Sequence, residues 1–163
     1  MSTSEHESAR LNIHHFLQVQ FKERYKAFVI HGPPLIGKTR LARQLVEIVT
    51  GGVYLDFLAY VAEHPGLAQR IDTLDVASVQ KIVMNYASEK GAKLLLVDEL
   101  DFLIHTWEPD LTPFKHLVSS LSVTQTPTTI GFLVQTYPAL ETWFLPNTER
   151  QNRILYVETI KAL

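Results

Sequence analysis

The feature that most constrains the fold is the segment Gly32-Pro-Pro-Leu-Ile-Gly-Lys-Thr39, which lies between an apolar run and an amphipathic stretch. It matches the pattern of two glycines separated by four residues and followed by Lys and Ser or Thr. Gly32 and Gly37 lack a Cβ atom, so the backbone amides of the segment can approach an anion closely. A helix that starts near Lys38 would point its free amides and positive dipole end at the same anion. The segment therefore predicts a phosphate-binding loop between a strand and a helix.

The apolar runs along the chain predict alternating strands and helices. Short aliphatic, β-branched or aromatic runs predict strands at residues 27–30, 53–61, 93–97, 129–134 and 154–159. Helical spacing of apolar residues predicts helices at 38–49, 75–90, 113–123 and 138–145, with a looser helical pattern at 9–26. Tyr54, Phe57 and Tyr60 fall within the second strand run, where we expect them to pack on the sheet. The alternation predicts an α/β fold, a three-layer αβα sandwich with a mainly parallel five-stranded sheet.

The composition is that of one globular domain. With 163 residues, 46% hydrophobic and 20% charged, the chain can bury a core without disulfides. We expect a flexible tail at residues 1–9 and a single domain at 10–163. The chain has no cysteine, no run of membrane-spanning length and a polar amino end unlike a signal peptide, so we expect a cytoplasmic location. The net charge of −2 argues against a dedicated nucleic-acid binder, although an assembly can create a basic channel.

Lys38 and Thr39 carry the chemistry expected of the loop. We expect the Lys38 ammonium at the β- and γ-phosphates, as a catalytic group, and the Thr39 hydroxyl on Mg²⁺. The other residues expected to bind the nucleotide are Gly32, Pro33, Pro34, Leu35, Ile36, Gly37 and Arg40. Pro33 and Pro34 have no N–H to donate and would only stiffen the loop. His31, directly before the loop, either approaches the nucleotide or simply ends its strand.

Two carboxylates, Asp98 and Glu99, follow the apolar run at 93–97. In a parallel sheet, ligands bind beyond the carboxyl ends of the strands, where the phosphate-binding loop also lies. There Asp98 can hold Mg²⁺, mostly through water, and Glu99 can orient and deprotonate an attacking water molecule. The alternative is a strand that meets solvent in an acidic turn. The phosphate-binding loop favours the functional interpretation, which predicts hydrolysis of a nucleotide.

With these two motifs, the chain resembles the additional-strand, catalytic-glutamate branch of P-loop ATPases, and above all the AAA+ core. Gly32–Thr39 looks like its Walker A motif and Leu94–Glu99 like its Walker B motif. The resemblance covers about residues 10–160 and implies a sheet order of 5-1-4-3-2, ATP as substrate and adenine near residues 13–17. It also implies a polar sensor residue after the fourth strand, at Gln135 or Thr136, with Gln135 preferred. The alternative role there is a strand-end cap for the helix that enters at Pro138.

The same family places an arginine finger before the fifth strand, where this chain has Arg150 and Arg153. Such a finger acts on the nucleotide of a neighbouring subunit, so it implies self-association. We take Arg150 as the candidate. The alternative is that both arginines are solvated residues of a polar loop.

The sequence ends at Leu163, just after the fifth expected strand, so we expect a core without the helical lid that AAA+ proteins usually carry. A free-standing core of this size is similar to the small P-loop protein of type 3 bacteriophage-exclusion (BREX) defence systems, which implies partners within a defence complex. We therefore expect a protein that binds ATP and ADP with Mg²⁺ and hydrolyses ATP within an assembly. Two alternatives remain: a nucleotide-gated interaction module with little hydrolysis of its own, and a small-molecule kinase. The kinase would need phosphate-binding arginines in a lid.

Overall fold

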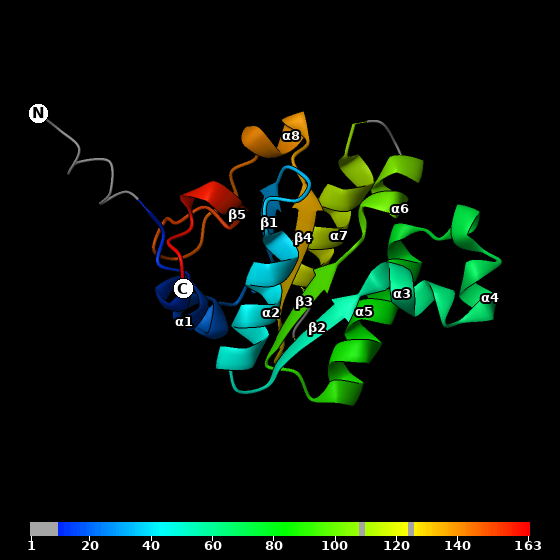
Figure 1. Cartoon of the computed structure of the whole chain (residues 1–163), viewed down its shortest axis with the longest axis horizontal. Coiled ribbons are helices and arrows are strands. Elements are labelled where there is room, and N and C mark those ends of the chain that lie inside the picture. The colour runs from blue at the N-terminus through cyan, green and yellow to red at the C-terminus, as the bar shows by residue number, and fades with distance from the viewer. Residues whose placement is uncertain (1–9, 108–109, 124–125) are drawn as a thin grey trace, which may run out of the picture.

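The computed structural model describes residues 10–107, 110–123 and 126–163, and the expected tail at 1–9 lies outside these residues. Five parallel strands form one sheet in the order β2-β3-β4-β1-β5. They are β1 (Phe28–Gly32), β2 (Gly52–Asp56), β3 (Leu94–Asp98), β4 (Thr129–Gln135) and β5 (Ile154–Tyr156). The predicted α/β class and strand order 5-1-4-3-2 are confirmed, and the sheet is parallel throughout (Figure 1).

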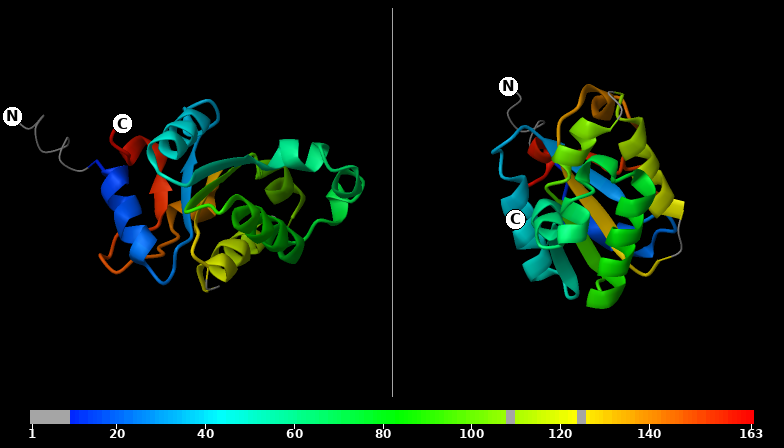
Figure 2. Two further views of the ribbon diagram at one scale, coloured as in Figure 1. Left: turned by 90° about the horizontal axis from the view of Figure 1, so that it is seen from below. Right: turned by 90° about the vertical axis from the view of Figure 1, so that its right-hand side faces the viewer.

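Helices cover both faces of the sheet (Figure 2). One face carries α1 (Ile13–Lys22) and α2 (Lys38–Ile48), and the other carries α5 (Val76–Lys90), α6 (Asp101–Thr106) and α7 (Thr112–Val123). Successive residues of a strand point to opposite faces, so each strand supplies two cores. In β3, Leu94 and Leu96 join the core under α1 and α2, while Leu95 and Val97 join the core under α5 and α7. This two-sided burial explains why the strands are apolar without alternation.

The second strand is shorter than its apolar run. It ends at Asp56, whose carboxylate accepts a hydrogen bond from the Ala59 N–H at 2.9 Å and caps the helix α3 (Phe57–Ala62). The expectation of a strand to residue 61 is therefore wrong, because an Asp cap starts a helix inside the run. Phe57 still packs in a core, but from a helix. Beyond it, α4 (Pro65–Ala68) and the 3₁₀ turn η2 (Ile71–Thr73) extend outward from the edge of the sheet that β2 forms (Figure 1).

The last elements are also shorter than expected. The helix expected at 138–145 is the single turn α8 (Pro138–Glu141), and the fifth strand gives way to the 3₁₀ turn η3 (Val157–Thr159). A further parallel bridge joins Leu11 to Ile160, so the segment before α1 is attached to the segment after β5. Within the described residues, no helix has both the length and the apolar character that a membrane span requires.

Candidate functional site

The predicted phosphate-binding loop lies at the carboxyl end of β1, which is an interior strand of the sheet. Gly32 is the last residue of β1, and α2 begins at Lys38. Gly37 precedes the helix with φ of 101°, a conformation that glycine adopts without strain, and no side chain caps this helix end. The first-turn amides of α2 are therefore open to an anion, as the sequence pattern predicts.

The side chains of Thr39 and Asp98 meet although 59 residues separate them. The Thr39 hydroxyl donates to Asp98 Oδ2 at 2.6 Å, and Asp98 is only 4% exposed. The Tyr54 hydroxyl donates to the same oxygen at 2.7 Å, and the Glu99 N–H donates to Asp98 Oδ1 at 2.9 Å. A carboxylate with three donors is held in one orientation. The structure thus brings together the two residues predicted to hold a metal ion.

Lys38 lies inside the loop that precedes it. Its ammonium donates to the carbonyl oxygens of Gly32 and Pro33, both at 2.8 Å. Burial lowers the pKa of Lys38, and the carboxylates of Asp101, Asp98 and Glu99 partly oppose this shift. No ion pair to Lys38 is found among the described residues, so its direct partners are the two carbonyl oxygens. A phosphate group placed at this loop would meet a cation that no carboxylate of the described residues contacts directly.

Glu99 differs from the carboxylate before it. Its backbone has φ of 61°, and its side chain is exposed, with no hydrogen bond described for the carboxylate. Partial desolvation raises the pKa of the Glu99 carboxyl, and the charges of Asp98, Asp56 and Asp101 add to this shift. A carboxylate that is available to solvent and has a raised pKa has the properties of a general base.

Beside the loop lies a cavity of about 350 Å³. Its lining residues are Pro34, Leu35, Gly37, Lys38, Thr39, Asp98, Glu99, Asp101 and Gln135. Gln135, the last residue of β4, is paired with Gly32 and lines the cavity. Thr136 instead bonds through Oγ1 to His31 Nδ1 at 3.0 Å, away from the lining. Of the two candidates for a sensor residue, the structure brings Gln135 into the cavity.

His31 is buried at the end of β1. Its ring lies 5.3 Å from the Tyr156 ring, and burial lowers its pKa, partly opposed by the charge of Glu141. These contacts join β1 to β5 and to the residue that follows β4. His31 therefore has the properties of a strand-end residue within the protein.

Asp101 and Tyr137 belong to the site but were not among the predicted residues. Asp101 Oδ1 accepts the Gln135 N–H at 2.9 Å and the Tyr137 hydroxyl at 2.6 Å, which ties the start of α6 to the end of β4. Burial and this hydrogen bond raise the pKa of Tyr137. The sequence shows Asp101 three residues after Asp98, close to the predicted site. Its partner Gln135, at the end of β4, follows only from the order of the strands in the sheet.

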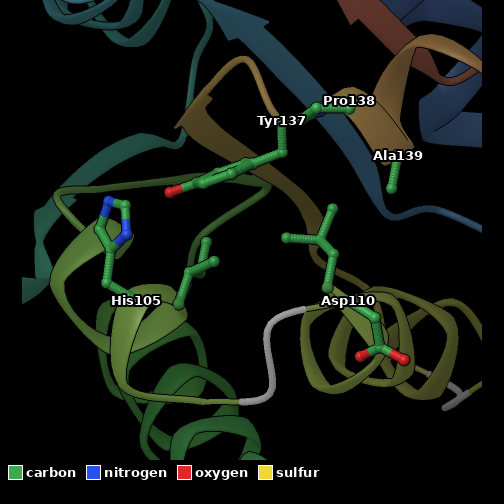
Figure 3. Close-up of a pocket in the computed structure, with 7 residues that line it drawn as sticks. His105, Asp110, Tyr137, Pro138 and Ala139 are labelled. Carbon is green, nitrogen blue, oxygen red and sulfur yellow. The ribbon is translucent and has the colours of Figure 1, made fainter.

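Tyr137 also borders a second cavity, of about 600 Å³. Its lining residues are Ile104, His105, Asp110, Leu111, Tyr137, Pro138 and Ala139. Figure 3 shows the rings of Tyr137 and His105 at the cavity, whereas the Asp110 carboxylate points away from the Tyr137 ring. The walls are therefore mostly apolar and aromatic, with no lysine or arginine among the lining residues.

The two candidate finger residues lie at the amino edge of the sheet, opposite the loop. Arg153 is 3% exposed, and its Nη1 donates to Ala27 O at 2.7 Å, Ser122 Oγ at 3.1 Å and Tyr25 O at 3.2 Å. Arg153 is thus neither solvated nor free to reach a neighbour. Arg150 is exposed on a tight turn, with φ of 63° and its N–H bonded to Asn147 O.

The remaining nucleotide-binding candidates fall into two groups. Leu35, Ile36 and Arg40 are exposed around the loop and the first turn of α2. In the region expected to contact adenine, Ile13, Phe16 and Leu17 are each 1% exposed and packed in the core. The functional interpretation of the loop rests on this geometry, because no family model and no curated protein matches the chain.

Proposed function

We propose that this protein binds ATP with Mg²⁺ at the loop 32–39 and hydrolyses it to ADP and phosphate. The observation that carries the proposal is the 2.6 Å contact between Thr39 and Asp98, beside Lys38 and the uncapped start of α2. A strand-end acidic turn alone would not require a threonine from a phosphate-binding loop on its carboxylate. The combination is what a site for a nucleoside triphosphate and a divalent cation needs.

The residues present fit Mg²⁺. The Thr39 hydroxyl and the Asp98 carboxylate are hard oxygen ligands, which Mg²⁺ prefers. Among the described residues, no cluster of three or more His, Cys, Asp or Glu side chains could hold a metal ion by itself. Mg²⁺ characteristically keeps several waters and takes few protein ligands, with phosphate oxygens completing its shell. Thr39 would ligate the ion directly and Asp98 would hold it, mostly through water. The ion would supply neutralisation of charge on the phosphate oxygens.

The other side chains divide the remaining tasks. The open amides of α2 and the Lys38 ammonium would bind the phosphate oxygens and stabilise their negative charge. Glu99 would accept a proton from a water molecule while the oxygen of that water forms a bond to the γ-phosphorus. The bond from that phosphorus to the oxygen of ADP breaks, and ADP leaves. Gln135, which lines the same cavity, would hydrogen-bond the water or the γ-phosphate.

We further propose that hydrolysis is faster in an assembly. No arginine lines the cavity among the described residues, so a cation from another molecule would complete it. Arg150, exposed at the opposite edge, is the candidate when that molecule is a second copy. The resemblance to a small protein of bacterial defence systems supports other proteins as further partners. If partners are required for turnover, the protein is a nucleotide-gated interaction module.

The test is binding and turnover of ATP by the wild type and Asp98→Asn, with the protein at several concentrations. We expect Mg²⁺-dependent binding in the wild type, loss of the Mg²⁺ dependence in Asp98→Asn, and turnover per molecule that rises with concentration. Binding without turnover at every concentration would favour the interaction module. Absence of nucleotide binding in the folded wild type would refute the proposal.

A further inference from the structure

Tyr54 contributes a hydroxyl to the site from the edge strand β2. This hydroxyl donates to Asp98 Oδ2 at 2.7 Å, and the same oxygen accepts the Thr39 hydroxyl at 2.6 Å. Tyr54 is paired with Leu96 in the register of β2 and β3, which sets its ring two residues before the end of the Asp98 strand. Its aromatic run was predicted to pack on the sheet, and that explanation does not account for a hydroxyl on a buried carboxylate.

The Tyr54 ring also contacts α2, through the Arg43 side chain. The Arg43 guanidinium lies over the ring, 4.5 Å from its centroid. Arg43 follows Thr39 by four residues on the helix, so the two side chains share one face. The ring also packs against the core under α1 and α2. The helix that supplies Thr39 thus fixes the tyrosine that contacts the partner of Thr39.

These contacts leave Asp98 little freedom. A carboxylate offers about four lone-pair positions, and Thr39, Tyr54 and the Glu99 N–H occupy three of them. Without the Tyr54 hydroxyl, Oδ2 would be held by Thr39 alone, and the Thr39 hydroxyl would then have to orient both the carboxylate and a metal ion. Outer hydrogen bonds of this kind fix the direction of metal-holding groups.

We propose that Tyr54 is a positioning residue for Mg²⁺, because its hydroxyl holds the Asp98 carboxylate in the orientation that binds the ion. This inference rests on the proposed function, since it concerns the same site. Tyr54 does not touch the nucleotide in this scheme. It acts on the affinity for the ion through Asp98, and leaves the phosphate contacts of Lys38 and α2 unchanged.

The test compares Tyr54→Phe with Tyr86→Phe, which removes a hydroxyl from another half-buried tyrosine, on α5. A fluorescent ATP analogue is titrated into each protein in excess chelator, and then at increasing Mg²⁺. We expect all three proteins to share one affinity in chelator, and Tyr54→Phe to need roughly tenfold more Mg²⁺ for half of the Mg²⁺-dependent gain. We expect Tyr86→Phe to match the wild type.

A Mg²⁺ requirement of Tyr54→Phe within twofold of the wild type would overturn the inference and leave the proposed function intact. A wild type that binds the analogue in no condition would refute both.

Arg43→Gln provides a second variant that keeps the hydroxyl. We expect the Mg²⁺ requirement of Arg43→Gln to shift in the same direction by a smaller factor. An unchanged requirement would refute the part that we assign to the contact between Arg43 and the Tyr54 ring. Thermal unfolding of each variant checks that it is folded, and Mn²⁺ binding followed by electron paramagnetic resonance gives a direct measure of the ion.

Discussion

Polar clusters lie at both ends of the strands: at the carboxyl ends, which form the carboxyl edge of the sheet, and at the amino ends, which form its amino edge. The charged groups of the two clusters differ in their surroundings. At the carboxyl edge, Lys38 meets only backbone carbonyls, and Glu99 is exposed with a raised pKa. At the amino edge, the buried Arg153 guanidinium donates to two carbonyls and a hydroxyl, and Glu23 accepts the N–H and the hydroxyl of Thr148. In the first cluster, Lys38 and the exposed Glu99 line a cavity, whereas in the second cluster the Arg153 guanidinium is closed off from solvent.

The difference teaches how to separate a functional charge from a structural one in this fold. A buried charge is tolerated when hydrogen bonds within the chain compensate it, and Arg153 Nη1 has three acceptors, although the buried Nε has no partner among the described residues. A cation at an open helix start beside a cavity is instead prepared for an anion from outside. Residue type alone does not distinguish them, because Arg150 and Arg153 are three positions apart in one loop. The predictions below test this distinction, in order of decreasing effect.

Replacing Lys38 with Ala should remove most nucleotide binding. The variant loses the charge-assisted hydrogen bonds to phosphate, so we expect a decrease in affinity of about 100-fold or more. Titration with a fluorescent ATP analogue measures it, and Lys81→Ala, an exposed lysine of α5, is the control. Affinity close to that of the wild type would mean that the carboxyl edge is as structural as the amino edge.

Replacing Glu99 with Gln should stop turnover while binding remains. The amide cannot accept the proton of water, so we expect a decrease in turnover of about 10²- to 10⁴-fold. Phosphate release measures turnover, and the analogue titration measures binding. The control is Glu89→Gln on the exposed surface of α5. Equal turnover in the two variants would exclude Glu99 as the base.

Replacing Arg153 with Met should destabilise the fold and leave the nucleotide site intact. The variant leaves the acceptors at Ala27, Tyr25 and Ser122 without their donor, so we expect the free energy of unfolding to fall by about 2–3 kcal/mol. Arg150→Met, on the exposed turn, should change it by less than about 0.5 kcal/mol. Denaturant unfolding measures both. If both variants lose the same stability, the contrast between the two arginines is wrong.

The smallest expected effect concerns His31 and pH. Burial lowers the pKa of His31 in the folded protein, so the neutral form is favoured there relative to the unfolded chain. Its contribution to stability is complete above the unfolded pKa of about 6.5 and decreases as the pH falls toward the folded pKa. His31→Gln keeps a hydrogen-bonding group beside Thr136 but does not titrate. We therefore expect the free energy of unfolding to fall less between pH 7.5 and pH 5.5 in His31→Gln than in the wild type, and an equal fall would contradict it.

Elements that depend on neighbouring residues were predictable. The helix α2 and its glycine-bounded loop follow from local spacing, and the five strands follow from short apolar runs. The end of β2 was not predicted correctly, because Asp56 caps a helix inside an apolar run that continues to Val61. Both signals were local, and hydrophobicity hid the cap.

By itself, the sequence determined the loop at 32–39, the buried strand before it and the carboxylate pair that ends another strand. Only the tertiary structure decided which distant side chains meet there. Thr39, Tyr54 and Asp98 come from α2, β2 and β3, and they converge because β3 lies between β2 and β4 in the parallel sheet. Likewise, only packing made Arg153 a buried donor while Arg150 stayed exposed. Local patterns are set by contacts of a few residues, whereas these pairings depend on strand order, register and burial, which no single segment contains.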